Sequence, residues 1–231
     1  MVGDAHQIIE ETVTLKAADG FSLEGFRARP SQGSKGGLVV LQEIFGLTDQ
    51  MKGVVRSYAR DGYDAIFPCV FDRAAPRTVV PFNEPERGRD LAYGLAMDKV
   101  FLDIAAAVEH VKSDRGVSVL GFCWGGGVLM RAAAELELRG AVSFYGTRLP
   151  SYLGQAVKCP MQFHFGVTDP NTPPETIDAV RRAIPSSEIW TYPAGHAFAN
   201  DARSTYVPEA AETARVRTLE FLRKHHEPRA H

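Results

Sequence analysis

The sequence predicts an α/β fold in which helices cover both faces of a mostly parallel central sheet. Short apolar runs suited to buried strands, such as residues 37–41 and 117–121, alternate with segments of helical periodicity, such as residues 99–111. Strands that alternate with helices pair in parallel, because each helix returns the chain over one face of the sheet. With 231 residues, 45% of them hydrophobic, the chain is expected to form a single domain over residues 1–231.

An antiparallel β-ribbon is expected at the start of this fold. Residues 11–15 and 21–26 alternate between apolar and polar side chains, and Ala18-Asp19-Gly20 provides a turn between them. Later strands are expected at residues 37–41, 63–68, 117–121, 140–145, 161–165 and 188–192, and helices at residues 51–60, 99–111, 128–138 and 208–225. Residues 71–86 have no regular pattern, so they form either a cap over a site or a plain surface loop.

The overall charge and the cysteine count exclude several classes of protein. A formal net charge of −2 gives no long-range attraction to nucleic acid or to an acidic membrane. Cys69, Cys123 and Cys159 are too few and too scattered for a disulfide framework or a zinc site. No apolar stretch approaches the roughly 20 residues that cross a bilayer, and the first residues lack the pattern of a signal peptide. We therefore expect a cytoplasmic protein that needs no metal or organic cofactor.

The segment Gly121-Phe122-Cys123-Trp124-Gly125 follows a predicted strand and precedes a predicted helix. This is the setting of a nucleophile elbow, a sharp turn that exposes its central side chain at the carboxyl edge of the sheet. Glycines relieve the crowding of such a turn, because they carry no Cβ. The free N–H groups at the start of the helix favour an anion, which suits a thiolate. The alternative is an inert, buried cysteine in a glycine-rich turn.

Two further residues complete a hydrolytic arrangement. Asp169 follows the predicted strand at residues 161–165, and His196 follows the last predicted strand. Both positions lie at the carboxyl ends of parallel strands, where folds of this class build their sites. The chain order of nucleophile, acid and histidine is that of α/β-hydrolases. The sequence therefore predicts an α/β-hydrolase fold with Cys123, Asp169 and His196 as a catalytic triad.

The oxyanion hole is expected to use two backbone N–H groups. One belongs to Trp124, directly after the nucleophile, and the other to the loop after the strand at residues 37–41. That loop reads Gln42-Glu43-Ile44-Phe45-Gly46, which makes Ile44 the candidate donor. Glu43 either reaches Cys123 or is a solvated loop carboxylate. His164 alternates with apolar neighbours, so it is expected to be a core residue and not a metal ligand.

With these motifs assembled, the chain resembles the dienelactone hydrolases (carboxymethylenebutenolidases) over nearly its whole length. The resemblance rests on the loop at residues 42–46, on the elbow at residues 121–126 with cysteine in place of the usual serine, and on Gly195-His196-Ala197-Phe198. It implies that Cys123, Asp169 and His196 form the triad and that Glu43 contacts the cysteine before substrate arrives. It also implies that Arg89 and Tyr93 help to bind a substrate carboxylate. The other residues expected at the substrate are Phe45, Tyr145, Phe198, Asn200 and Arg203.

The chain departs from the family pattern at three positions that bear on the substrate. Ala197 and Asn200 stand where dienelactone-specific members carry a serine and an arginine, and Ala96 stands where they often have a tryptophan. An asparagine cannot replace the bidentate contact of an arginine with a carboxylate. Arg203 could substitute for that arginine only if the loop is rearranged. These departures imply a roomier pocket and argue against dienelactone itself as the natural substrate.

The expected reaction is hydrolysis of a small ester or lactone through a thioester on Cys123, with His196 moving the protons and Asp169 orienting it. A cysteine esterase of broad specificity is the alternative enzyme. A non-catalytic protein that uses Cys123 as a reactive thiol is a third reading, although such a protein would not need Asp169 and His196. No long exposed apolar pattern is evident, so we expect a monomer.

Overall fold

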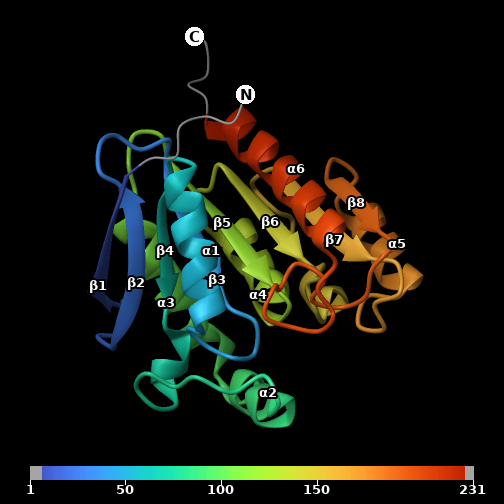
Figure 1. Ribbon diagram of the computed structural model, residues 1–231, viewed down its shortest axis with the longest axis horizontal. Coiled ribbons are helices and arrows are strands. Elements are labelled where there is room, and N and C mark those ends of the chain that lie inside the picture. Colours follow the sequence, from blue (N-terminus) through green and yellow to red (C-terminus); the bar gives the residue numbers. More distant parts are fainter. Residues whose placement is uncertain (1–6, 227–231) are drawn as a thin grey trace. The chain divides into compact units, whose positions relative to one another are not determined.

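The computed structural model describes residues 7–226, and within them the chain forms eight β-strands and six α-helices (Figure 1). These elements fall into two compact units: the N-terminal unit ends at Ser118 and the C-terminal unit begins at Val119. The α/β class with an N-terminal β-ribbon is confirmed, whereas a single domain over residues 1–231 stays a prediction. Within residues 7–226, no helix combines the length and the apolar character that a membrane-spanning segment needs.

In the N-terminal unit, four strands pair around the expected ribbon. β1 (Ile8–Lys16) runs antiparallel to β2 (Ser22–Pro30). β2 is also antiparallel to β4 (Asp64–Pro68), and β4 pairs in parallel with β3 (Gly37–Leu41). Every residue of β3 is buried, as its unbroken apolar sequence predicts.

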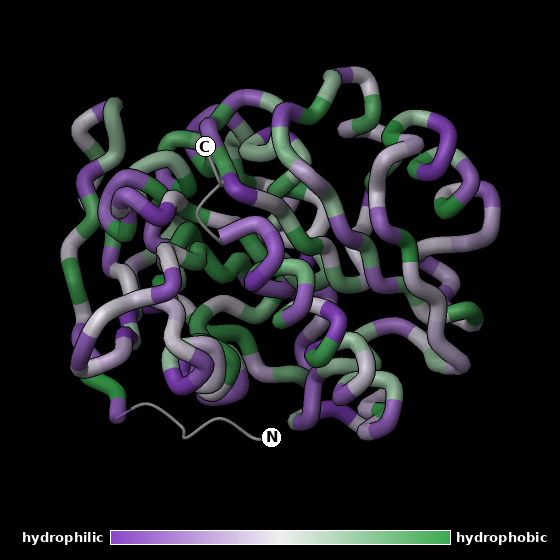
Figure 2. The backbone as a smooth tube through the Cα atoms, turned by 90° about the horizontal axis from the view of Figure 1, so that it is seen from above, coloured by the Kyte–Doolittle hydropathy of each residue, from purple (hydrophilic) through white to green (hydrophobic). Residues whose placement is uncertain are grey.

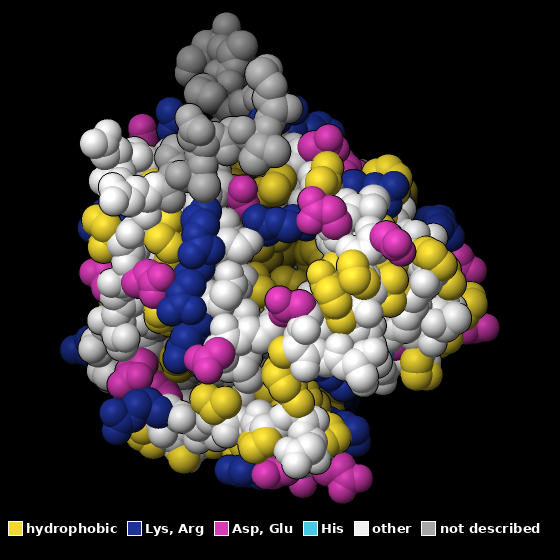
Figure 3. Space-filling model, in the orientation of Figure 1, with side chains coloured by type: hydrophobic (Ala, Val, Ile, Leu, Met, Phe, Trp, Pro, Cys, Tyr) yellow, Lys and Arg dark blue, Asp and Glu magenta, His cyan; other side chains and the backbone are white. Residues whose placement is uncertain are grey.

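Helices α1 (Asp49–Arg60) and α3 (Met97–His110) cover opposite faces of these strands, with α1 in front and α3 behind in Figure 1. α1 is capped by Thr48, whose hydroxyl accepts a hydrogen bond from the N–H of Met51. The helix α1 carries a basic residue at every fourth position, Lys52, Arg56 and Arg60. Figure 3 shows a column of dark blue side chains on this face of the molecule.

Helix α2 (Pro85–Gly94) lies in a stretch where the sequence pattern predicts no helix. Its first residue is a proline, which is compatible with a helix start because an N–H at that position would have no helical partner. Gly88 is buried and lets α2 approach the loop after β3, since a Cβ at this position would collide with the carbonyl oxygen of Ile44. The helix therefore depends on tertiary packing that a local pattern does not reveal.

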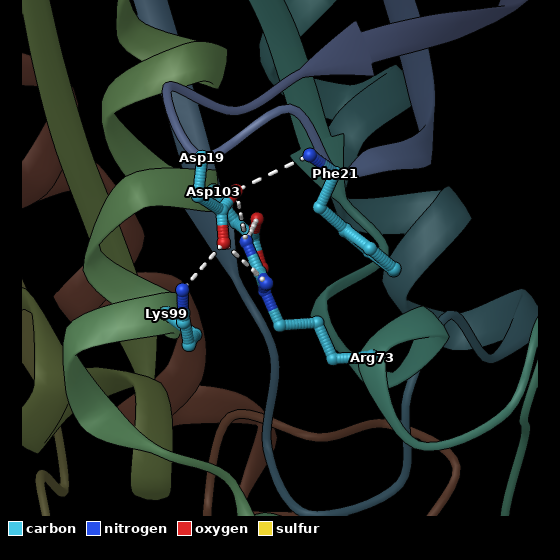
Figure 4. Close-up of polar contacts among 5 residues, drawn as sticks. All are labelled: Asp19, Phe21, Arg73, Lys99 and Asp103. Carbon is cyan, nitrogen blue, oxygen red and sulfur yellow. Dashed lines mark hydrogen bonds and ion pairs between the residues drawn. The ribbon is translucent and has the colours of Figure 1, made fainter.

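A cluster of charged side chains ties α3 to the β1–β2 turn and to the short 3-10 helix Val70–Arg73 (Figure 4). The Arg73 guanidinium donates two hydrogen bonds to Asp103, each 2.7 Å long, and two to Asp19, at 3.0 and 3.2 Å. Lys99 also donates to Asp19, at 2.9 Å, and the guanidinium lies 4.4 Å from the centroid of the Phe21 ring. The Asp103 side chain is fully buried, so Arg73 supplies its counter-charge.

In the C-terminal unit, strands follow one another across the sheet in chain order. They are β5 (Val117–Phe122), which begins two residues before the boundary, β6 (Gly140–Phe144), β7 (Met161–Gly166) and β8 (Glu188–Tyr192). The pairs β6–β7 and β7–β8 are parallel, as expected for strands that are separated by helices. Their carboxyl ends therefore open onto the same edge.

Helices α4 (Trp124–Glu135) and α6 (Pro208–His226) lie on opposite faces of these strands, with α6 in front in Figure 1. Helix α5 (Pro174–Ala183) connects β7 to β8. The end of α6 is hydrophilic, seen as the purple tube near the label C in Figure 2, because its last turn contains Arg223, Lys224, His225 and His226.

The start of α4 differs from the expectation: the helix begins at Trp124 and not at Val128. The expected helix leaves out Gly125-Gly126-Gly127, and glycines are poor helix formers. In the structure these glycines let the helix pack closely on the segment after β6. A Cβ at Gly126 would lie 2.8 Å from the Cα of Gly146, and one at Gly127 would collide with the carbonyl oxygen of Thr147. Packing therefore outweighs the low helix propensity.

His164 on β7 is a buried core residue with satisfied hydrogen bonds, as expected. Gln162 donates through Nε2 to Glu188, so its Oε1 faces His164 and must accept from His164 Nε2, 2.9 Å away. The proton therefore sits on Nε2, and Nδ1 accepts from the hydroxyl of Tyr192 at 2.8 Å. Burial, assisted by the nearby charge of Arg217, lowers the pKa of His164 to about 3.

This network predicts that acid destabilises the protein through His164. The folded state holds the imidazole neutral down to about pH 3, whereas the unfolded chain protonates it near its ordinary pKa of about 6.5. Stability from this group is therefore present above pH 6.5 and falls by about 1.4 kcal/mol per pH unit below it. Urea unfolding at pH 6.5 and 5.0 measures this slope. The slope of the unfolding free energy against pH should be smaller in His164→Phe and unchanged in the surface control His110→Phe. Equal slopes in both variants would show that His164 is not the group responsible.

Candidate active site

The elbow has the backbone geometry that its sequence predicts. β5 ends at Phe122 and α4 begins at Trp124, so Cys123 alone forms the turn. Cys123 has φ 52° and ψ −115°, a conformation that residues with a Cβ rarely adopt. Gly121 has no room for a side chain, because a Cβ there would lie 2.8 Å from the backbone nitrogen of Gly126. The turn holds the Cys123 side chain at the carboxyl end of the strand.

The structure brings Cys123, His196 and Asp169 together in one hydrogen-bonded chain within the C-terminal unit. His196 Nε2 lies 3.2 Å from the Sγ of Cys123. His196 Nδ1 lies 2.7 Å from Oδ2 of Asp169, and because a carboxylate only accepts, Nδ1 is the donor. Cys123 and Asp169 are 7% and 3% exposed. The arrangement can pass a proton between Sγ and Nε2 while Asp169 fixes the ring.

Loops after two neighbouring strands hold the acid and the base. Asp169 comes three residues after β7, in a turn where its Oδ1 accepts a hydrogen bond from the N–H of Asn171 at 2.8 Å. His196 comes four residues after β8. The two loops are joined by a hydrogen bond of 3.1 Å from the N–H of Thr168 to the carbonyl of Ala194. This link fixes the distance between the carboxylate and the imidazole.

The electrostatics of the pair favour a charged imidazole. Burial alone would lower the pKa of His196, but hydrogen bonds to Asp169 and Cys123 raise it to about 10. Burial alone would likewise raise the pKa of Asp169, but the hydrogen bond from His196 outweighs it and lowers the pKa. Asp169 is therefore an anion at neutral pH, and it stabilises the positive charge on His196.

Two aromatic rings that were expected at the substrate, and a buried serine that was not, pack around this arrangement. Tyr145 is fully buried, and its ring meets the imidazole of His196 edge-on, with centroids 5.2 Å apart. Phe198, also fully buried, lies edge-on to Tyr145 at 5.4 Å. Ser143 donates a hydrogen bond of 2.8 Å to the carbonyl of Gly126 in the first turn of α4. No sequence signal separates Ser143 from any other small residue of a buried strand.

The remaining expected residues of the C-terminal unit lie near the elbow or the histidine in the chain. Trp124 directly follows Cys123 and is the first residue of α4. Ala197 is fully buried and has φ 60°, a constraint that sequence alone does not show. Asn200 is buried and accepts a hydrogen bond from the N–H of Ala202, and Arg203 is half-buried. Their roles toward a substrate stay predictions.

Other expected site residues belong to the N-terminal unit. Glu43, Ile44 and Phe45 lie in the loop after β3, beginning two residues beyond its end, and are 3%, 8% and 2% exposed. Glu43 is therefore no solvated loop carboxylate; its contact with Cys123 and the oxyanion role of Ile44 stay predictions. Arg89 and Tyr93 lie one turn apart on α2, and both are exposed. Among residues 7–226 no cluster of three potential metal ligands occurs.

Comparison with known proteins identifies the family. The family model described as the dienelactone hydrolase family matches residues 23–226. A carboxymethylenebutenolidase of Pseudomonas putida is 30% identical, over 93% of this chain and 97% of that protein, and one of Pseudomonas sp. (strain P51) is also 30% identical, over 94% and 96%.

Solved structures share the fold. A protein from Klebsiella pneumoniae assigned as a dienelactone hydrolase has a TM-score of 0.83 at 27% identity, covering 94% of this chain and 99% of that chain. Brefeldin A esterase, a bacterial homologue of human hormone sensitive lipase, has a TM-score of 0.70 at 14% identity, covering 98% and 79%. The chain therefore has the α/β-hydrolase fold, belongs to the dienelactone hydrolase family and is a hydrolase of that type.

Proposed function

We propose that this hydrolase cleaves a small lactone or carboxylic ester through a thioester on Cys123. The observation that carries the proposal is the hydrogen-bonded chain from Cys123 through His196 to Asp169, with its distances of 3.2 and 2.7 Å. A nucleophile, a base and a group that orients the base are the parts that acyl transfer requires. A monomer that acts in the cytoplasm remains our expectation.

The proposed reaction has two halves. His196 Nε2 first takes the proton of the Cys123 thiol, and the thiolate attacks the carbonyl carbon. His196 then donates that proton to the departing alkoxide oxygen, which leaves a thioester. Neutral His196 then takes a proton from a water molecule, and the resulting hydroxide attacks the thioester. The acid is released, His196 returns the proton to the sulfur of Cys123 and the resting thiol forms again, so no oxidant, reductant or cofactor is consumed. Asp169 stays ionised throughout and stabilises the imidazolium, in keeping with its lowered pKa.

The charge that develops on the carbonyl oxygen is assigned to two backbone donors, the N–H groups of Trp124 and Ile44. Trp124 directly follows the nucleophile at the start of α4, the position from which this kind of elbow supplies one of its two donors. Losing one donor of this kind typically raises the barrier by roughly 3 kcal/mol, so the two together supply a large share of the rate.

The substrate class follows from the relatives and from the positions where this chain differs. Carboxymethylenebutenolidases at 30% identity suggest a lactone that carries a carboxylate, for which Arg89 and Tyr93 on α2 are the proposed contacts. Ala96 is exposed, and the amide of Asn200 already accepts a hydrogen bond from Ala202. These features favour a second candidate, an esterase with wider specificity that does not select for a carboxylate.

A hydrolysis screen separates these candidates. We expect turnover of dienelactones, other lactones or aryl esters by the wild type, and only the uncatalysed background with Cys123→Ala. Preference for anionic lactones supports the lactonase, and equal rates with neutral aryl esters support the broad esterase. Stable adducts on Cys123 without turnover of any of these compounds would overturn both in favour of a thiol-sensing protein.

Glu43 is expected to keep the resting thiol protonated and thereby to shield it from oxidation, because a buried carboxylate disfavours a nearby thiolate. Glu43 is 3% exposed. Alkylation by iodoacetamide, measured as rate against pH, should shift toward lower pH in Glu43→Ala. The matched control Glu137→Ala removes a surface carboxylate of the C-terminal unit and should leave the profile unchanged. An identical profile for Glu43→Ala and wild type would contradict this role of Glu43.

A further inference from the structure

The N-terminal unit contains a cavity of about 300 Å³ between β2, α1 and the segment after β4. None of the residues proposed for catalysis or substrate binding lines it. Its volume is at the lower end of the range for pockets that hold small organic ligands. The cavity therefore has room for one small ring and a polar group.

One part of the cavity wall is apolar and chemically inert. The rings of Phe26 and Phe71 and the side chain of Leu47 line it together with Cys69. Burial raises the pKa of Cys69 to about 12, so this thiol is neutral and contributes a soft apolar surface. Such a wall suits a flat apolar ring of a ligand.

The charged groups around the cavity leave little net charge for an ionic ligand. Arg56 is held by Glu10 through two hydrogen bonds of 2.8 and 2.9 Å. Both oxygens of Asp72 accept backbone N–H groups, from Glu24 at 2.8 Å and from Arg77 at 2.7 Å. The wall has three cations, Lys52, Arg56 and Arg77, and two carboxylates, Glu24 and Asp72. Glu10, which lies outside the wall, neutralises Arg56. Neither sign dominates, which favours a neutral ligand.

Gln42 supplies the specific polar feature of the wall. Its side chain is 1% exposed, and neither Nε2 nor Oε1 has a hydrogen-bond partner within residues 7–226. A buried amide without partners is costly, and a ligand that pairs with it recovers that free energy. Because the amide presents one donor beside one acceptor, its complement is another carboxamide, which can form two hydrogen bonds at once.

We propose that this cavity is a second binding site, for a small neutral molecule that joins a flat apolar ring to a carboxamide. The ring lies against Phe26, Phe71 and Leu47, and the carboxamide pairs with Gln42. A carboxylate of the same shape binds more weakly, because it offers Oε1 no donor and brings an uncompensated charge. The site is independent of the proposed reaction at Cys123.

Benzamide is the probe, with benzoate as its matched anionic control. Titrations of the full-length Cys123→Ala protein, followed by amide NMR shifts, keep the proposed nucleophile out of the measurement. We expect benzamide to bind with a Kd of about 1 mM, as suits so small a ligand. Shifts should concentrate at residues 24–26, 42, 46–47 and 69–79, and benzoate should bind at least about tenfold more weakly. No binding, equal binding of both probes, or shifts confined to residues 121–126 and 194–198 would overturn the proposal.

Paired glutamine variants test the contact itself. Gln42→Leu keeps the size of the side chain and removes both amide atoms, so benzamide affinity should fall at least about tenfold. Gln50→Leu makes the same change on α1 outside the cavity wall and should leave affinity unchanged. Thermal unfolding establishes that each variant is folded, and Gln42→Leu should unfold no earlier than the parent because it loses two unpaired buried atoms. Unchanged benzamide affinity in Gln42→Leu contradicts the proposed site. If that variant does not fold, the comparison of benzamide with benzoate tests the site instead.

Discussion

Replacing Asp169 with asparagine lowers kcat/KM for ester hydrolysis by about 10⁴ while the protein stays folded. Asparagine keeps the shape of the carboxylate but removes its charge, and its amide can present a donor to His196 Nδ1. The ring then places its proton on Nε2, facing Cys123, so the nitrogen that must accept a proton is blocked. The hydrogen bond to Asp169 also raises the pKa of His196 toward about 10. Its loss therefore lowers the imidazolium fraction most strongly between neutral pH and pH 10.

Steady-state rates on an activated aryl ester between pH 6 and 10 measure both effects. Asp178→Asn serves as the control, because this aspartate is exposed on α5 and pairs with Arg181 at the surface. Its kcat/KM should stay within about twofold of the wild type, since exposed ion pairs contribute little. If Asp169→Asn kept more than a tenth of the wild-type rate, Asp169 would not be the group that orients the base.

Replacing Arg73 with methionine lowers the free energy of unfolding by about 3–5 kcal/mol. The substitution leaves the carboxylate of Asp103 buried without its counter-charge, and it removes four hydrogen bonds in all. Burial already raises the pKa of Asp103 even with Arg73 in place. The melting temperature should fall by about 10 °C. Urea titration and thermal melts give both values.

A second substitution tests whether the lost stability comes from the unpaired, buried carboxylate of Asp103 or from the other contacts of Arg73. Asp103→Leu in the Arg73→Met background removes that charge, so most of the lost stability should return. Arg181→Met, which breaks an exposed pair, should change the free energy of unfolding by less than about 1 kcal/mol. A double variant no more stable than Arg73→Met would show that the cluster acts through packing on Phe21 and not through charge.

The candidate triad could be predicted because each member carries a local signal. Cys123 lies between glycines after a buried apolar run, and Asp169 and His196 each follow such a run within a few residues. The strands could be predicted equally well, since β3 is an unbroken apolar segment and β5 is apolar except for Ser118. Parallel pairing then brings the strand ends to one edge. Local pattern and topology together thus place these three residues near one another.

What the sequence did not show depends on contacts between distant segments. Arg73, Asp19 and Asp103 are 30 to 84 positions apart, and nothing in their neighbours pairs them. The expected start of α4 at residue 128 leaves out Gly126 and Gly127, because their helical packing is set by Gly146 and Thr147. The positive φ angle of Ala197 likewise could not be predicted from the sequence, since alanine has no tendency toward positive φ.

The φ angle of 52° at Cys123 limits which nucleophiles evolution or an engineer can install at this position. A β-branched side chain crowds a backbone in this region, so threonine is excluded although it carries a hydroxyl. Serine and cysteine both have an unbranched Cβ and can occupy the same turn without moving it. The exchange between an oxygen and a sulfur nucleophile is therefore open to a single substitution. Whether the exchange succeeds is decided by the chemistry of the histidine and the acid, and not by the fold.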